Sequence, residues 1–337
     1  MERWQQFQKR IFDQLFRHLN DPDPLQLLAD ELGLSRNTLY KRYAGYTPFH
    51  LEELIKLSEK YDLSLDALLK SSNNKYEFYF PFSRKSRPDP GAFMSNIAKD
   101  LDFLIKAGHP SVWYVSDEIP FFQYMHFDLL FAFKLCIWGR LIWTGEGMLD
   151  PINPVELMEA LREDQDLNDM RLQILDMYLK IPTVEIWSTP VIDNTVEQIK
   201  YLVYTGQLQD KALLEEILDD MDQLTDHMRH QAEKGEKFAD KEGLTSRSGL
   251  ELYHNEMTHT NNTILTRCDA GKTIYLTYDN PNYMKCESED LCEYTEDWMQ
   301  NLQRQSLLIS KTAEKHRVHY FQAIKDKLAQ LRKELEV

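Results

Sequence analysis

The stretch Leu25–Thr47 reads LQLLADELGLSRNTLYKRYAGYT and predicts a helix, a tight turn and a second helix. Asp23 suits the N-cap of the first helix, and Pro24 suits its first helical position. Gly33 stands where the chain needs a positive φ to end that helix. The apolar residues of the first helix recur at helical spacing; they are Leu25, Leu28 and Leu32. The stretch therefore predicts two short helices that pack across a turn.

The second helix begins after Ser35, a good N-cap, and its periodicity turns Leu39 and Tyr43 inward. Its outward arc is polar and consists of Arg36, Asn37, Tyr40 and Lys41. Side chains of these types hydrogen-bond to base edges and phosphates when a helix enters a DNA major groove. The pattern therefore indicates a helix that contacts DNA.

The first 70 residues resemble the Xre/lambda-repressor-like helix-turn-helix family of transcription regulators. That family pattern has a small residue in the first helix, then Gly-apolar-Ser, Arg-x-Thr-apolar, a Gly, a Pro and an apolar helix. The matching positions are Ala29, Gly33-Leu34-Ser35, Arg36-Asn37-Thr38-Leu39, Gly45, Pro48, Leu51, Leu54, Ile55, Leu57 and Leu63–Leu69. The resemblance implies a five-helix domain whose third helix reads DNA.

The same resemblance implies which residues bind DNA. Contacts to bases and nearby phosphates are expected from the outward arc of the third helix, and contacts to the DNA backbone from its end and the following loop. The expected DNA-binding set is Ser35, Arg36, Asn37, Tyr40, Lys41, Arg42, Tyr46 and Thr47. A solvated helix face is the simpler alternative, but the polar positions lie inside a matched motif, which favours DNA.

Composition limits the class of protein further. The chain has 337 residues, 42% of them hydrophobic and 12% aromatic, which is enough for a large packed core. Its formal charge of −16 argues against a chain that coats nucleic acid along its length. No acidic residue lies between Glu31 and Glu52, however, so the motif forms a small basic segment on an acidic protein. Four dispersed cysteines and no secretory signal predict reduced thiols and a cytoplasmic protein.

The rest of the chain predicts a mainly α protein. We expect a helix-turn-helix domain at 1–70, a linker at 71–90, and a predominantly helical domain at 91–337. A small antiparallel β section with a hairpin is expected near 250–278, with Asp269–Lys272 as a four-residue loop. The apolar run Phe121–Trp143 is expected to be a core helix rather than a membrane span, because charged residues interrupt it.

The sequence predicts neither a metal site nor an enzyme. His254 and Glu256 would share a face of a strand, but with His259 they match no recognised zinc spacing. Two further histidine pairs, one helical turn apart, form equally weak ligand sets; they are His227 with His230 and His316 with His319. The chain contains no Gly-x-Ser-x-Gly nucleophile motif and no glycine-rich phosphate loop. We expect no cofactor.

An effector site stays open as a hypothesis. The aromatic residues between Trp113 and Trp143 are expected to be core, but some could line a pocket for an unknown small molecule. Its polar contacts would come from Asp117, Glu118 or Lys134. The effector could equally be a protein.

Together these features predict a sequence-specific DNA-binding transcription regulator, a repressor by the habit of the family, that acts as a homodimer. Two helices have apolar seams suited to self-association, Leu214–Met228 and Phe321–Leu335, and we expect the second to form the dimer. The alternative is that the second seam folds back over its own β-hairpin. The rival functions are a protein-interaction module, or a defence-related effector that carries the helix-turn-helix as an arm.

Overall fold

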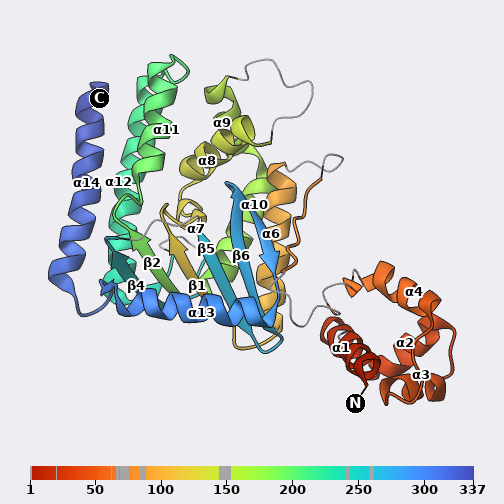
Figure 1. The fold of residues 1–337 in the computed structure, drawn as a ribbon. Coiled ribbons are helices and arrows are strands. Elements are labelled where there is room, and N and C mark those ends of the chain that lie inside the picture. The colour runs from red at the N-terminus through yellow and green to blue at the C-terminus, as the bar shows by residue number, and fades with distance from the viewer. Residues whose placement is uncertain are drawn as a thin grey trace. The chain divides into compact units, whose positions relative to one another are not determined.

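The chain forms two compact units in the computed structural model, Met1–Glu77 and Phe78–Val337 (Figure 1). The structure describes residues 2–19, 21–61, 63–65, 68, 76–83, 89–143, 153–239, 243–257 and 262–337. The boundary between the units falls within the segment 71–90 that the sequence predicts as a linker. Each unit has its own hydrophobic core.

The first unit is a small helical domain. Its helices are α1 (Arg3–His18), α2 (Pro24–Leu32), α3 (Arg36–Tyr43) and α4 (Leu51–Tyr61). Apolar side chains from these helices form the hydrophobic core. The fully buried ones include Ile11, Phe12, Leu15, Leu28, Ala29 and Leu39. The fifth helix expected at 64–70 lies largely outside the described residues. The described helices have the order that the helix-turn-helix pattern predicts.

The second unit is an α/β domain, so the predicted fold class is wrong. Eight strands form one mixed sheet in the order β3-β4-β2-β1-β5-β6-β7, and β8 pairs with β4. The strands are β1 (Ser111–Ser116), β2 (Thr183–Ser188), β3 (Glu236–Lys237), β4 (Ser248–Asn255), β5 (Thr263–Cys268), β6 (Gly271–Asp279), β7 (Asn282–Cys286) and β8 (Leu307–Leu308). Strands β1, β2 and β4 run parallel. The expectation of a mainly α domain with a small antiparallel β section missed this parallel half.

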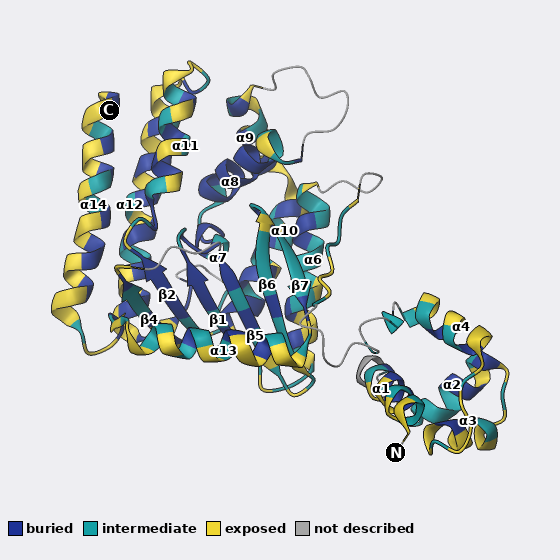
Figure 2. Ribbon diagram, viewed as in Figure 1, coloured by how far each residue is buried: buried dark blue, intermediate teal, exposed yellow. Residues whose placement is uncertain are grey.

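Helices cover the two faces of the sheet unequally (Figure 2). The large core joins one face to most helices: α6 (Pro90–Lys106), α7 (Phe121–Tyr124), α8 (Asp128–Leu141), α9 (Pro154–Glu163), α10 (Gln165–Leu179), α11 (Asp193–Tyr204), α12 (Lys211–Lys234) and α14 (Glu314–Leu335). A smaller core joins Val115 and Ile186 on the other face to Cys292 and Met299 of α13 (Glu289–Arg304). Parallel strands buried on both faces in this way are typical of α/β domains.

The apolar run at Phe121–Trp143 breaks into α7 and α8 rather than forming one core helix. Every residue of α8 from Leu129 to Trp138 is buried, and Lys134 among them is 1% exposed. None of the helices in the described ranges is both long enough and apolar enough to cross a bilayer. The run is therefore apolar all round because α8 lies inside the domain.

The structure corrects one local prediction in the β region and adds one strand. The expected four-residue hairpin loop is shorter, because β5 and β6 already pair at Cys268 and Gly271. Strand β7 was not expected, and it extends the antiparallel half of the sheet. Its outer edge pairs with the segment after the first unit: Tyr79 and Lys285 exchange backbone hydrogen bonds of 2.8 and 2.9 Å.

Both apolar seams suited to self-association, including the terminal one expected to form the dimer, pack inside the chain. Helices α12 and α14 pack against each other, and the seam residues of each are buried. Arg332 of α14 pairs with Asp219 and Asp222 of α12 at 2.6 and 3.0 Å. The terminal helix thus folds back on helices of its own domain, and neither seam is available to a second copy.

Candidate nucleic-acid interface

The turn between α2 and α3 has the conformation that the sequence predicts. Gly33 caps α2 with φ 68° and ψ 29°, in the left-handed region. The N–H of Leu34 then donates to the carbonyl of Ala29 at 2.9 Å. Ser35 caps α3, because its Oγ accepts a hydrogen bond from the N–H of Thr38 at 3.2 Å. These local contacts fix the angle at which α3 leaves α2.

Seven of the eight expected DNA-binding side chains lie on the surface. The exposed residues are Ser35, Arg36, Asn37, Tyr40, Lys41, Tyr46 and Thr47. Leu39 is buried beneath them, as predicted. Tyr43 was also predicted to turn inward, but it is 42% exposed, and only one side of its ring packs against Phe12 and Phe16 of α1. One side of α3 therefore anchors the helix, and the opposite side offers hydrogen-bond donors and acceptors to solvent.

Arg42 is the exception and is removed from the expected contacts. It is 5% exposed, and its Nη2 lies 2.7 Å from Oε1 of Glu53 on α4. Its Nη1 donates to the carbonyl of Pro48. A guanidinium enclosed by these acceptors cannot reach a phosphate. Helical spacing alone could have predicted this burial, because Arg42 follows the buried Leu39 by three residues and so lies on the same face of α3.

Two glutamines of α1, missed by sequence reasoning, hold the loop after α3. Gln5 Nε2 donates to the carbonyl of Gly45 at 3.0 Å, and Gln8 Nε2 donates to that of Thr47 at 3.0 Å. Gln8 Oε1 also accepts from the N–H of Phe49 at 2.8 Å. Gln8 is 4% exposed. Because buried polar groups are hydrogen-bonded, a glutamine on the apolar face of an amphipathic helix indicates that its amide binds nearby backbone groups. The loop that displays Tyr46 and Thr47 is thereby held in place.

Arg36, the first residue of α3, pairs with Asp23, the N-cap of α2. The closest nitrogen–oxygen distance is 3.2 Å, between Nη2 and Oδ2, and Nε donates to Oδ2 at 3.3 Å. The two side chains are 56% and 48% exposed. The pair therefore lies at the surface and joins the amino ends of the two helices.

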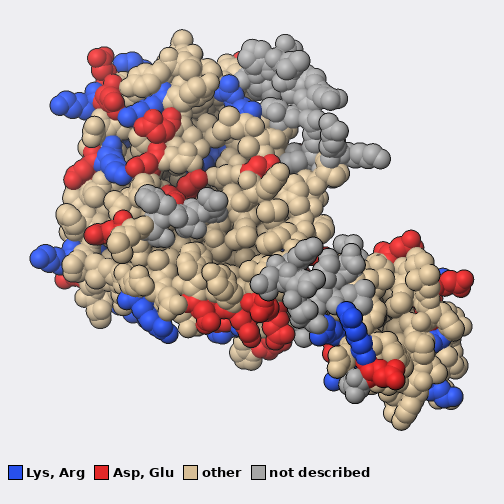
Figure 3. All heavy atoms as spheres, viewed as in Figure 1, with Lys and Arg blue, Asp and Glu red and all other residues tan. Residues whose placement is uncertain are grey.

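The surface of the α/β unit differs in charge from α3. Acidic side chains gather over α13 in Figure 3, and the exposed ones on that helix are Glu289, Asp290, Glu293 and Asp297. Between Glu31 and Glu52 the motif has no acidic residue. The exposed acids of α13 would therefore repel a polyanion, whereas the segment between Glu31 and Glu52 adds no negative charge.

The structure also places the residues of the effector-site hypothesis. Lys134 Nζ donates to Thr195 Oγ1 at 2.9 Å and to Gln198 Oε1 at 3.0 Å, and it lies 4.8 Å from the centroid of the Tyr124 ring. Burial lowers the pKa of Lys134 to about 8, and the negative charge of Glu118 opposes that shift. Lys134 is thus held by two side chains of α11, and Glu118 is close enough to influence its charge.

A second buried lysine belongs to the packing of the sheet. Lys237 Nζ lies 3.5 Å from the centroid of the Tyr178 ring and donates to the Tyr178 carbonyl at 2.7 Å. Glu185 accepts hydrogen bonds from Tyr178 at 2.5 Å and from Trp187 at 3.0 Å. Burial lowers the pKa of Lys237 to about 7 and raises the pKa of Glu185. These hydrogen bonds satisfy the polar atoms within the core, so we interpret the group as structural.

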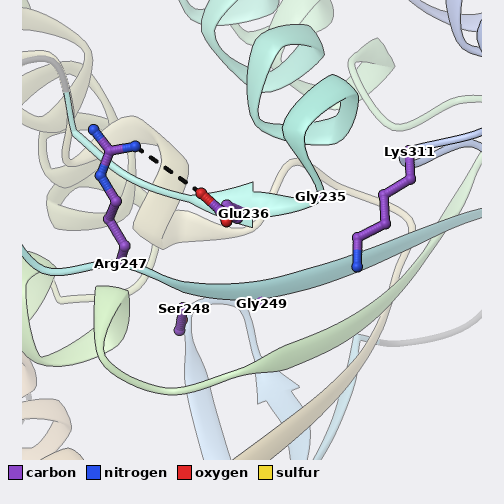
Figure 4. Close-up of a pocket in the computed structure, with 6 residues that line it drawn as sticks. All are labelled: Gly235, Glu236, Arg247, Ser248, Gly249 and Lys311. Carbon is purple, nitrogen blue, oxygen red and sulfur yellow. Dashed lines mark ion pairs between the residues drawn. The ribbon is translucent and has the colours of Figure 1, made fainter.

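A small cavity of about 220 Å³ lies at the start of β4 (Figure 4). Its lining consists of Gly235, Glu236, Arg247, Ser248, Gly249 and Lys311. Arg247 pairs loosely with Glu236 at 4.0 Å, and Lys311 approaches from the opposite side. The cavity adjoins the carboxyl end of α12, whose partial negative charge already favours these cations. The arrangement therefore needs no ligand.

The histidines expected to be weak metal candidates do not assemble a site within the described residues. His254 bonds to Thr189 Oγ1 at 3.0 Å and packs on the Tyr320 ring, and burial lowers its pKa. Glu256 is exposed on the same segment, and His259 falls outside the described residues.

Comparisons with known proteins add no relative. No protein-family model, no curated protein and no solved structure matches the chain.

Proposed function

We propose that this protein is a sequence-specific DNA-binding transcription regulator that inserts α3 into the major groove. The observation that carries the proposal is the division of α3 into two sides. Leu39 and Arg42 anchor the helix, while Arg36 and Asn37 at its start and Lys41 in its last turn are exposed. A helix fixed from behind, with amide and guanidinium groups in front, suits direct reading of base edges.

The proposal includes action as a homodimer and as a repressor. One helix-turn-helix contacts one half-site, and two linked copies make the second contact effectively intramolecular. Because the apolar faces of α12 and α14 are buried within the α/β unit, the proposed dimer surface lies elsewhere on the chain. Steric exclusion of polymerase from an operator is the expected mechanism of repression. The α/β unit is proposed to supply the dimer contacts and to sense a signal.

A salt series on genomic fragments tests the proposal. In a mobility-shift assay the protein should shift a small subset of fragments at 150 mM salt, and many more at 50 mM salt, because phosphate contacts weaken as salt rises. Lys41→Ala should lower affinity for all fragments by a similar factor. Binding of no fragment at either salt concentration would contradict DNA binding and favour the protein-interaction alternative.

A further inference from the structure

The pair between Asp23 and Arg36 has a geometry that bears on DNA recognition. Arg36 presents its side edge to the carboxylate, with Nε donating to Oδ2 at 3.3 Å and Nη2 donating to Oδ1 at 3.4 Å. A guanidinium carries five N–H donors, so the end-on pair from Nη1 and Nη2 stays free. An end-on pair of donors is the group that bonds bidentately to O6 and N7 of guanine.

Asp23 is itself held in place by its neighbours. Its Oδ1 accepts the N–H of Gln26 at 3.2 Å as the cap of α2, and its own N–H donates to Asp21 Oδ1 at 2.8 Å. One bond holds a carboxylate oxygen and the other holds the backbone of the same residue, and a carboxylate positioned in this way restricts the rotamers of the arginine that it binds. Exposed ion pairs contribute little to folding stability, so this fixed geometry matters more for the direction of Arg36 than for the fold.

The same carboxylate changes the electrostatics at the start of α2. A helix N-terminus normally attracts phosphate, because its free N–H groups and dipole favour negative charge. Here Asp23 occupies that position, and Pro24 at the first helical residue has no N–H to offer. The corner of α2 beside Arg36 therefore repels a phosphate.

We propose that Asp23 is a specificity-determining residue, which directs Arg36 to a guanine and keeps phosphate from binding Arg36 or the α2 N-terminus. The inference rests on the proposed DNA-binding function. With Asp23 present, Arg36 contributes to one base position. Without it, the guanidinium swings to the nearest phosphate and contributes equally to all sequences.

Selection from a library of random duplexes, followed by affinity measurements, tests the inference. The variant Asp23→Asn keeps the α2 cap, because Asn and Asp cap equally well, and Asp23→Ser provides a second capping side chain. Asp30→Asn is the matched control, since Asp30 is an exposed acid of α2 whose side chain binds Gln26 and not Arg36. Arg36→Lys keeps the charge but removes the bidentate donors.

The wild type should enrich a motif with one guanine that both Asp23→Asn and Arg36→Lys cease to prefer. Asp23→Asn should lower the ratio of cognate to scrambled affinity by about tenfold. It should also steepen the logarithmic salt dependence on scrambled duplex by about 0.9, the value for one added phosphate contact. Asp30→Asn should retain both the guanine and the wild-type slope.

Two results would overturn the inference, and they are distinguishable. If the wild type enriches a motif and both Asp23 variants retain it with an unchanged affinity ratio, Asp23 does not determine specificity, although DNA binding stands. If the wild type enriches no motif, the proposed function fails, and the role of Asp23 fails with it.

Discussion

Arg42 and Glu53 form a buried ion pair that joins α3 to α4. Nη2 lies 2.7 Å from Oε1, and the residues are 5% and 9% exposed. The second carboxylate oxygen accepts the N–H of His50 at 2.8 Å. The pair therefore fixes the loop between the two helices, and a residue expected to contact phosphate instead supports the fold.

Arg42→Ala should destabilise the first unit by about 3–5 kcal/mol, because it leaves the Glu53 carboxylate buried without its partner. Urea unfolding of the full chain, followed by the loss of α-helical signal from the first unit, measures this. Replacing both partners, Arg42→Met with Glu53→Leu, should restore most of the loss. Lys41→Ala, at the exposed neighbouring position, should change stability by less than about 0.5 kcal/mol. Equal effects from Arg42→Ala and Lys41→Ala would show that the ion pair is unimportant.

Gly33→Ala should destabilise the turn by about 1–2 kcal/mol, the cost of a left-handed conformation for a residue with a Cβ. A Cβ at Gly33 would meet no atom within 4 Å, so the cost is conformational and not steric. Hydrogen–deuterium exchange of the α2 and α3 amides in the full chain measures the opening free energy. Gly33→Asn should cost less, since Asn tolerates this region better. Unchanged exchange in the alanine variant would contradict the cap.

Lys134 should make stability depend on pH. Its pKa is about 8 in the folded protein, whereas an ordinary lysine has a pKa of 10.5. Between pH 8 and pH 10.5 the unfolded chain therefore binds more protons at this residue than the folded chain does. The free energy of unfolding contributed by Lys134 therefore rises as pH increases through that window, and the cost of burying its charge is present in full below it.

Comparison with Lys134→Met isolates this effect, because other titrating groups cancel. Between pH 7.5 and 10 the stability of the wild type relative to the variant should increase by about 1–3 kcal/mol, at ~1.4 kcal/mol per pKa unit. Chemical unfolding at four or five pH values gives the curve. A constant difference across the range would mean that Lys134 keeps an ordinary pKa despite its burial.

Phe321→Ala should destabilise the α/β unit by about 3–5 kcal/mol, because Phe321 is 1% exposed in the large core. Val318→Ala on the same helix is the control; Val318 is 49% exposed and should change stability by less than about 0.5 kcal/mol. Removal of residues 312–337 should accordingly unfold the α/β unit rather than produce a folded monomer. A truncated chain that retains its cooperative thermal transition would contradict the packing of α14.

The first unit was predictable because its signals are local. Asp23, Gly33 and Ser35 act through neighbouring backbone groups, so capping rules read directly from the sequence place two helices and the turn. The exposed polar side of α3 was predictable as well, except at Arg42. Its three-residue spacing from Leu39 already indicated the buried face, but its carboxylate partner Glu53 lies on another helix and is not apparent from the local sequence.

The sheet was not predictable in the same way. Strand β2 carries Glu185 in its middle, and a carboxylate there interrupts the apolar run that marks a buried strand; its hydrogen bonds to Tyr178 and Trp187 exist only in the folded chain. The parallel pairing of β1 with β2 brings Val112 beside Thr183, although several helices separate the two residues in the sequence. A local sequence pattern cannot predict a pairing between such distant segments. The hairpin of β5 and β6 was visible because its turn is short.

The most direct test of the account is the affinity of the wild type and Asn37→Ala for an enriched duplex and for its scrambled sequence at one salt concentration. Fluorescence anisotropy should show the wild type binding the enriched duplex at least about 10³-fold more tightly than the scrambled one. Asn37→Ala should lose about 1–3 kcal/mol on the enriched duplex and nothing on the scrambled one. Equal binding of both duplexes by the wild type, or no binding at all, would contradict sequence-specific recognition by α3.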